Sequence, residues 1–331
     1  MKALVYTSEK YLEYKDYDEP VQKDGEELIK IDSVGICGSD MHAFLGHDER
    51  RPSPLILGHE PSGTIIGGSN NGKRVTINPL VTCGSCQFCK IDKDNLCSTR
   101  QIISMPPREG AFAEFLSIPK QNLVYVPNEI SLEKACLAEP LACGWHSVRI
   151  AKETMNCDLQ NLRCLIIGGG AIGISSALAL KTHAVKEIYL AETNSIRHNM
   201  INQACEMEVF DPNQNNPIEE GDADLVIDCV GLSATREMAS RFVSPGGLIM
   251  HIGLGEPKHG LDIRRMTLQE ITFIGTYTYT SQDFKDTAKA IFDGRLGSLD
   301  WTETRPLKEG QNCFDEIFNG KSSSPKIILK P

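Results

Sequence analysis

The sequence of 331 residues lacks a long apolar run, an excess of positive charge and an apolar leader. Its longest apolar run, residues 164–180, is interrupted by a glycine triplet, whereas a membrane-spanning helix needs about 20 apolar residues. The net charge of −10 argues against nucleic acid as a partner, because two polyanions repel one another. The first ten residues, MKALVYTSEK, lack the apolar core of a secretory signal. We therefore expect a cytoplasmic protein with neither a membrane nor a nucleic acid as partner.

Cysteine is abundant, with 12 residues, and four cysteines fall within one short stretch, CGSCQFCKIDKDNLC. These four are Cys83, Cys86, Cys89 and Cys97. Without an export signal, reduced thiols and metal ligation explain such a cluster better than disulfides do. Four thiolates form a closed tetrahedral zinc site that has no open position for a substrate. We therefore predict a structural zinc site, with an iron–sulfur cluster or scattered reduced thiols as the alternatives.

The distribution of strand and helix patterns predicts two domains, which the length also favours. The first 140 residues contain short strand-like runs between Gly, Pro and Asn, such as EELIKIDSVG and PSGTIIGG, which favour an antiparallel, barrel-like unit. From RCLIIGGGAIG onward, apolar strands alternate with helical segments. This alternation is typical of a doubly wound parallel sheet. The predicted fold class is α/β, with a β-rich domain followed by a parallel-sheet domain.

A glycine-rich turn follows the first strand of the second domain. Gly168, Gly170 and Gly173 have the G-x-G-x-x-G spacing, and Ala171 and Ile172 open the helix that comes next. In such a turn the glycines permit a tight bend, a close approach of the backbone to a pyrophosphate, and close packing of helix on strand. The free N–H groups of the helix then face the phosphates. The motif predicts a dinucleotide site, and a glycine turn without a ligand is the alternative.

An acidic residue stands where a dinucleotide's adenosine ribose would be bound. Glu192 ends the next strand, 19 residues after Gly173, which is the usual distance for an acid that accepts hydrogen bonds from the ribose. Its carboxylate would repel a 2′-phosphate, so we predict NAD as the cofactor. Arg197 lies five residues further on, and because an arginine can accommodate that phosphate, NADP remains the alternative.

Three separated segments, GICGSDMH, LGHEPSG and LAEPLACGWH, carry a second set of candidate ligands. The residues of interest are Cys37, Ser39, His42, His59, Glu60 and Glu139. Thiolate, imidazole and carboxylate are good zinc ligands, and an open set of three leaves room for a substrate. Each residue also has an ordinary structural explanation: a core cysteine, a turn histidine, a solvated acid at a helix start. Because spacing alone cannot bring the segments together, both interpretations stay open at this point.

Taken in order, these motifs resemble those of the zinc-dependent medium-chain dehydrogenases, and most closely the branch of sorbitol and other polyol dehydrogenases. The similarity extends over essentially the whole chain. It implies a GroES-like catalytic domain over residues 1–140, with a structural-zinc lobe at about 83–97. It further implies a Rossmann domain over 141–276 and a C-terminal segment, 277–331, that returns to the first domain. The family also implies a homo-oligomer, a dimer or a tetramer.

The resemblance assigns a role to each candidate residue. It implies that Cys37, His59 and Glu60 hold a catalytic zinc, that Glu139 contacts this metal or its water, and that Ser39 and His42 relay a proton. The four cysteines would hold the second zinc, and NAD would accept a hydride from a small-molecule alcohol. The alternatives are an NADPH-dependent carbonyl reductase, a zinc-free enone reductase and a non-catalytic NAD-sensing protein.

The substrate is less clearly indicated. Relatives of the sorbitol dehydrogenase type have an aromatic residue directly after the relay histidine, whereas this chain has Ala43 there, followed by Phe44. Replacement of an aromatic ring by alanine would open the pocket. Arg50, Arg51 and Arg108 are either solvated loop residues or, as a sharper hypothesis, ligands for an anionic end of the substrate, because a guanidinium group binds two oxygens at once.

Overall fold

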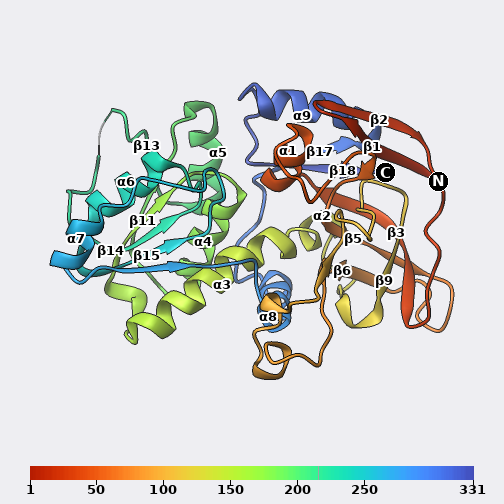
Figure 1. The fold of residues 1–331 in the computed structure, drawn as a ribbon, viewed down its shortest axis with the longest axis horizontal. Coiled ribbons are helices and arrows are strands. Elements are labelled where there is room, and N and C mark those ends of the chain that lie inside the picture. The colour runs from red at the N-terminus through yellow and green to blue at the C-terminus, as the bar shows by residue number, and fades with distance from the viewer. Residues whose placement is uncertain (215) are drawn as a thin grey trace. The chain divides into compact units, whose positions relative to one another are not determined.

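The computed structural model describes residues 1–214 and 216–331, which divide into two compact units (Figure 1). Unit 1 contains residues 1–140, 280–293 and 302–331, and unit 2 contains residues 141–279 and 294–301. The segment expected to return to the first domain is therefore split, because residues 294–301 belong to unit 2. No helix among the described residues is long and apolar enough to cross a membrane.

Unit 1 is built around a largely antiparallel seven-stranded sheet, in which β10-β6-β5-β3-β18-β17 follow one another and β9 also pairs with β3. A smaller sheet has the order β2-β1-β4 and a third joins β7 to β8. The strands are β1 Lys2–Ser8, β2 Tyr11–Asp16, β3 Glu26–Gly35, β4 Leu55–Ile56, β5 Glu60–Ile66, β6 Arg74–Ile77, β7 Leu80–Val81, β8 Gln101–Ile102, β9 Phe115–Pro119, β10 Leu123–Tyr125, β17 Thr302–Pro306 and β18 Lys326–Lys330. The helices are α1 Gly38–Phe44, α2 Leu132–Ala135, α8 Ser281–Phe292 and α9 Gly310–Phe318.

The pairing of strand β3 determines what lies at one end of this sheet. Gly35, its last residue, is opposite Glu60 of β5 on one side and Ile328 of β18 on the other. Both pairings are antiparallel, so the end of β3 meets the beginnings of β5 and β18. Chain segments that are far apart in the sequence therefore converge where β3 passes into α1.

The core of unit 1 also joins the two ends of the chain. Phe44 of α1 and Phe314 of α9 are fully buried, with their ring centroids 5.1 Å apart. Phe112 meets Phe314 edge to face at 6.0 Å, a separation typical of favourable aromatic pairs. This packing holds the helix that follows β3 against the C-terminal part of the chain.

Unit 2 is a six-stranded parallel sheet with the order β13-β12-β11-β14-β15-β16, as the alternation of strands and helices predicted. The chain starts in the middle at β11, runs outward to β13 and returns to β14, which is the doubly wound arrangement. Its strands are β11 Arg163–Ile167, β12 Glu187–Ala191, β13 Glu208–Phe210, β14 Ala223–Asp228, β15 Val243–His251 and β16 Thr272–Gly275. Its helices are α4 Ala171–Thr182, α5 His198–Cys205, α6 Ser233–Phe242 and α7 Ile263–Leu268, and α3 Ala138–Met155 begins in unit 1 and continues into unit 2.

Candidate functional site

Three of the predicted metal ligands come together in unit 1. Cys37 directly precedes α1, and His59 and Glu60 lie at the start of β5. One ligand atom from each of them lies within 4.8 Å of the others. A thiolate, an imidazole and a carboxylate at this separation suit a zinc ion and leave a fourth position open.

Asp40, which the sequence analysis did not single out, links the two segments that carry these ligands. Its carboxylate is fully buried and accepts hydrogen bonds from the backbone N–H groups of Cys37, at 3.0 Å, and Gly58, at 3.1 Å. Its Oδ1 lies 3.3 Å from Nδ1 of His59. Burial alone would lower the pKa of His59, but the negative charge of Asp40, followed by that of Cys37, raises it well above its usual value. Among the described residues Nδ1 of His59 has no hydrogen-bond partner, so Asp40 acts on the imidazole through its charge from the Nδ1 side, while Nε2 faces Ser39.

Glu60 has a cationic partner that the sequence analysis also missed. Nζ of Lys326, in β18, lies 2.6 and 2.7 Å from the two carboxylate oxygens of Glu60 and donates to the carbonyl of Ile36 at 2.8 Å. Burial alone would lower the pKa of Lys326, but the negative charges of Glu60 and Cys37 outweigh it and raise the pKa above its usual value. Lys326 is 266 residues from Glu60, so no local pattern could have pointed to the pair.

The three residues predicted to handle protons or water lie in the same unit. Ser39 and His42 are three residues apart on α1, and residues at this spacing share one face of a helix. Oγ of Ser39 is 3.4 Å from Nε2 of His59. Glu139, in the first turn of α3, is buried and close enough for its charge to raise the pKa of Lys326. It is not one of the three residues whose ligand atoms cluster among the described residues.

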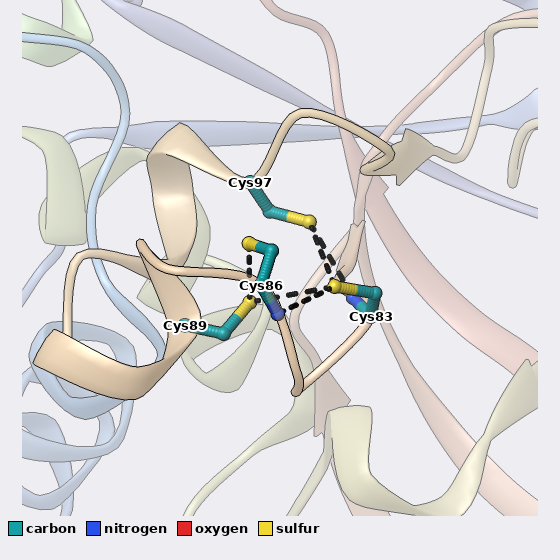
Figure 2. Close-up of side chains that lie close together, drawn as sticks. All are labelled: Cys83, Cys86, Cys89 and Cys97. Carbon is teal, nitrogen blue, oxygen red and sulfur yellow. Dashed lines mark hydrogen bonds between the residues drawn. The ribbon is translucent and has the colours of Figure 1, made fainter.

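The four cysteines of the short stretch converge on one point, with their sulfur atoms facing one another (Figure 2). The sulfur of Cys83 is 3.5 Å from that of Cys97 and 3.9 Å from that of Cys89, which in turn is 3.5 Å from the sulfur of Cys86. Separations of this size suit four sulfur ligands around one zinc ion, since a Zn–S bond is about 2.3 Å long.

The surroundings of the four sulfur atoms act on their pKa values in opposite directions: burial, followed by the hydrogen bond with Cys86, raises the pKa of Cys89 to about 12. Hydrogen bonds from the backbone at Ser85 and Cys86 lower the pKa of Cys83 to about 5. Strands β7 and β8 pair where the lobe begins and ends. Asp94 accepts hydrogen bonds from the backbone N–H of Ser281, at 3.0 Å, and from its hydroxyl group, so that the lobe is fastened to the start of α8.

In unit 2 the glycine-rich turn joins β11 to α4. Gly168 has φ = +99°, a conformation that glycine adopts without strain. A Cβ on Gly173 would overlap the carbonyl oxygen of Gly168, so only glycine lets α4 pack this closely against the turn. A Cβ on Gly170 would meet nothing within 4 Å. The backbone at Gly170 therefore faces open space at the N-terminus of α4, where Ala171 and Ile172 form the first turn, and this space suits a phosphate group.

Glu192 lies beside this turn. One carboxylate oxygen of Glu192 accepts the backbone N–H of Gly169 at 2.9 Å, and the other accepts that of Asn194 at 2.7 Å. Glu192 is thereby held beside the glycine-rich turn. Nε of Arg197 is buried and has no hydrogen-bond partner within residues 1–214 and 216–331, so this side chain retains a donor for a ligand.

The three arginines considered as ligands for an anionic substrate have carboxylate partners within unit 1. Arg51 is buried and paired with Asp48 at 2.6 Å, and Arg50 bonds the same carboxylate at 2.8 Å. Arg108 pairs with Glu26 at 3.0 Å. Arg51 and Arg108 therefore act as structural ties, whereas Arg50 shares the one carboxylate of Asp48 with Arg51 and its side chain is 58% exposed.

Ala43, which stands where sorbitol-type relatives have an aromatic residue, is fully buried among the hydrophobic residues of unit 1. It packs directly against the core of this unit.

Comparison with known proteins identifies the family. Residues 23–128 match the alcohol dehydrogenase GroES-like domain, and residues 171–293 match the zinc-binding dehydrogenase domain. The L-galactonate-5-dehydrogenase of Escherichia coli strain K12 is 30% identical over 89% of this chain and 88% of its own length. The (R,R)-butanediol dehydrogenase of Saccharomyces cerevisiae is 27% identical over 100% of this chain and 98% of its own.

Solved structures agree with these matches. An oxidoreductase of unknown specificity from Escherichia coli superposes with a TM-score of 0.89 at 26% identity, covering 99% of this chain and 98% of its own. The predicted fold class, a GroES-like domain with a Rossmann-like parallel sheet, is thereby confirmed. The chain belongs to the zinc-dependent medium-chain dehydrogenases, enzymes of alcohol oxidoreduction that use zinc and a nicotinamide cofactor.

Proposed function

We propose that this protein oxidises a secondary hydroxyl group of a polyol or a sugar-derived alcohol, with NAD as the acceptor, at the site formed by Cys37, His59 and Glu60. The observation that carries the proposal is the convergence of these three ligand atoms to within 4.8 Å of one another, with the hydroxyl group of Ser39 3.4 Å from His59. Unit 1 would then be the catalytic domain, and unit 2 the nucleotide-binding domain.

Each residue near the ligands has a task in this reaction. When bound, zinc supplies the Lewis acidity that lowers the pKa of an alcohol, and NAD takes up the hydride. Ser39 would accept the hydroxyl proton while it releases its own, through the cofactor ribose, towards His42 and solvent. Glu139 would contact the metal or its water. The four-cysteine lobe holds a second, structural zinc and takes no part in the chemistry.

The nucleotide site would be formed by the glycine-rich turn. The backbone at Gly168, Gly170 and Gly173, with the first turn of α4 at Ala171 and Ile172, binds the pyrophosphate. Glu192, held by two backbone N–H groups, accepts the ribose hydroxyl groups and repels a 2′-phosphate. NADP is the second candidate because of one specific observation, the unpartnered Nε of Arg197. In that case the enzyme would be a carbonyl reductase.

We further propose a homo-oligomer that forms through unit 2 and functions in the cytoplasm. Strand β16 is an end strand of the parallel sheet among the described residues, and such an edge offers free backbone groups to a second copy. Leu254, Ile263 and Leu268, which precede β16, are 69%, 63% and 72% exposed. Light scattering tests this proposal, and a stable monomer at micromolar concentration would contradict it. The cytoplasmic assignment is supported by thiolate ligands that need a reducing compartment.

The function is tested with a panel of neutral polyols, sugar acids and sugar phosphates, each with NAD and with NADP, followed by nicotinamide absorbance. We expect turnover of at least one secondary alcohol with NAD, and we expect it to disappear in Cys37→Ser. A wild-type protein that contains zinc but oxidises none of these compounds with either cofactor would contradict the proposal.

A further inference from the structure

We propose that Lys326 is a positioning residue of the catalytic metal centre, where its ammonium group holds the Glu60 carboxylate in the orientation that a metal requires. The inference rests on the function proposed above and adds a residue that neither the motifs nor the ligand set include. It also assigns a purpose to strand β18, the last strand of the chain.

The ammonium group of Lys326 has all its hydrogen bonds made within the protein. An ammonium group has three N–H donors, and Lys326 uses them on three acceptors: both oxygens of Glu60 and the carbonyl of Ile36. The side chains of Lys326 and Glu60 are 2% and 0% exposed. Since no donor is left over and water has no access, the carboxylate is held in one place.

Gly35 provides the space in which the Glu60 and Lys326 side chains meet. Gly35 of β3 lies opposite Glu60 in β5 and opposite Ile328 in β18. A Cβ on Gly35 would overlap the Glu60 carboxylate and would lie 3.3 Å from Cδ of Lys326. The two side chains therefore meet across the one position of β3 that has no side chain.

The free energy of burying the Lys326–Glu60 ion pair does not by itself explain its presence. A buried ion pair is weak evidence for a stabilising role, because the cost of removing two charges from water is comparable to their attraction, and apolar pairs of similar size serve stability equally well. A purpose beyond stability is therefore needed. An ionised carboxylate has about four lone-pair positions, and two N–H bonds leave the others for a metal beside Cys37 and His59.

A second lysine on the same strand provides a matched control. The ammonium group of Lys330 also pairs with two carboxylates, that of Asp32 at 3.1 Å and that of Glu133. Its side chain is 33% exposed, however, and neither partner is a predicted metal ligand. If Lys326 mattered only for folding, replacing Lys326 or Lys330 would change the stability of the protein to different degrees and leave metal affinity unchanged in both variants. If Lys326 orients a ligand, only its replacement changes metal binding.

The experiment measures zinc affinity of the full-length protein by competition with a chelator, for wild type, Lys326→Met, Lys326→Arg and Lys330→Met. Loss of a hydrogen-bonding partner behind a ligand typically weakens metal binding by about 10- to 100-fold. We expect this loss for one of the two zinc ions in Lys326→Met, partial recovery in Lys326→Arg, and wild-type affinity in Lys330→Met. Wild-type affinity for both ions in Lys326→Met would overturn the proposal.

A double-mutant cycle separates orientation of Glu60 from a general effect on the fold. In the Glu60→Gln background, Lys326→Met should cause less than about a twofold further loss of zinc affinity, because the group that it orients is already altered. An undiminished loss in that background would also overturn the proposal. Should Lys326→Met fail to fold, Gly35→Ala displaces the same carboxylate from the other side and must release the same zinc ion.

Failure of this inference can be told from failure of the proposed function. The proposed function fails if wild-type protein oxidises no alcohol on the panel. The inference about Lys326 fails if an active wild type and Lys326→Met bind zinc equally tightly, whatever their turnover.

Discussion

The two ligand sets of unit 1 differ in how the chain assembles them. The four-cysteine lobe takes its ligands from residues 83–97 and consists of sulfur alone, with Cys83 exposed. The mixed set takes Cys37 from the link between β3 and α1, His59 from just before β5 and Glu60 from the first position of β5, and β18 contributes Lys326 from far along the chain. A closed set built from one local loop is suited to holding that loop. An open set at the junction of three strands is suited to chemistry.

The groups around a ligand distinguish a structural metal site from a catalytic one better than the residue type of the ligand does. In the lobe, backbone hydrogen bonds stabilise the Cys83 thiolate, and Asp94 fastens the loop to Ser281 at the start of α8. In the mixed set, buried charged side chains, Asp40 and Lys326, stand behind His59 and Glu60. Such partners fix the orientation and basicity of a ligand, which matters most where a reaction takes place.

The largest effect should come from removing the proton acceptor beside the mixed set. We expect Ser39→Ala to lower kcat about 100- to 10,000-fold, the usual contribution of a positioned acid or base. Steady-state kinetics measures the change, and zinc content and the melting midpoint should stay at wild-type values. A Ser39→Ala enzyme with wild-type kcat would show that the mixed set does not use this hydroxyl group.

The next effect should appear in stability and not in chemistry. Cys97 is the buried member of the lobe, and metal affinity in a structural site is folding free energy. We expect Cys97→Ser to lose one zinc ion and to lower the melting midpoint by on the order of 10 °C. Calorimetry measures this change. An unchanged melting midpoint combined with lost turnover would reverse the roles of the two sets.

The two ligand sets also differ in how much of each could be predicted from the sequence. The lobe was predicted from spacing alone, because its ligands are neighbours in the chain. The grouping of Cys37 with His59 and Glu60 needed a family resemblance, since it depends on the pairing of β3 with β5. Lys326 was not found at all, because one lysine near the end of the chain carries no signal until β18 is placed beside β3.

Asp40 was overlooked although it lies inside the quoted motif GICGSDMH. Asp40 stands three positions after Cys37, the N-cap of α1, and bonds its backbone N–H, but because cysteine is not a usual N-cap residue, the sequence carries no capping signal here. The ion pairs of the arginines differ in how far the sequence indicates them. Asp48 lies three residues before Arg51, so that pair could have been expected, whereas the pairing of Arg108 with Glu26 depends on the fold.

In unit 2, Glu192 belongs to the predicted nucleotide site, which, like the four-cysteine lobe, could be predicted from the local spacing of its residues. Glu192→Ala should narrow the preference for NAD over NADP by about tenfold or more, because hydrogen bonds to a charged group are worth about 1.5–3 kcal/mol. The ratio of kcat/KM for the two cofactors measures the preference. A wild-type enzyme that favours NADP would contradict the assignment and would direct attention to Arg197.

The smallest effect concerns the attachment of the lobe to α8. Asp94→Ala removes the acceptor of the Ser281 N–H at the start of that helix. Loss of such an acceptor costs about 1 kcal/mol, which corresponds to roughly 2–4 °C in the melting midpoint. Both zinc ions should remain, so that Asp94→Ala separates loss of the attachment from loss of the metal. Release of zinc from this variant would show that the attachment also maintains the ligand geometry.

The central claim is that one ligand set serves chemistry and the other serves stability. It is tested most directly by counting zinc ions per chain in wild type and Cys37→Ser, with the melting midpoint measured on the same samples. The two ligand sets predict about two ions in wild type and about one in Cys37→Ser, with a melting midpoint close to that of wild type. A single ion in wild type, or a fall in the melting midpoint of Cys37→Ser as large as that of Cys97→Ser, would contradict the claim.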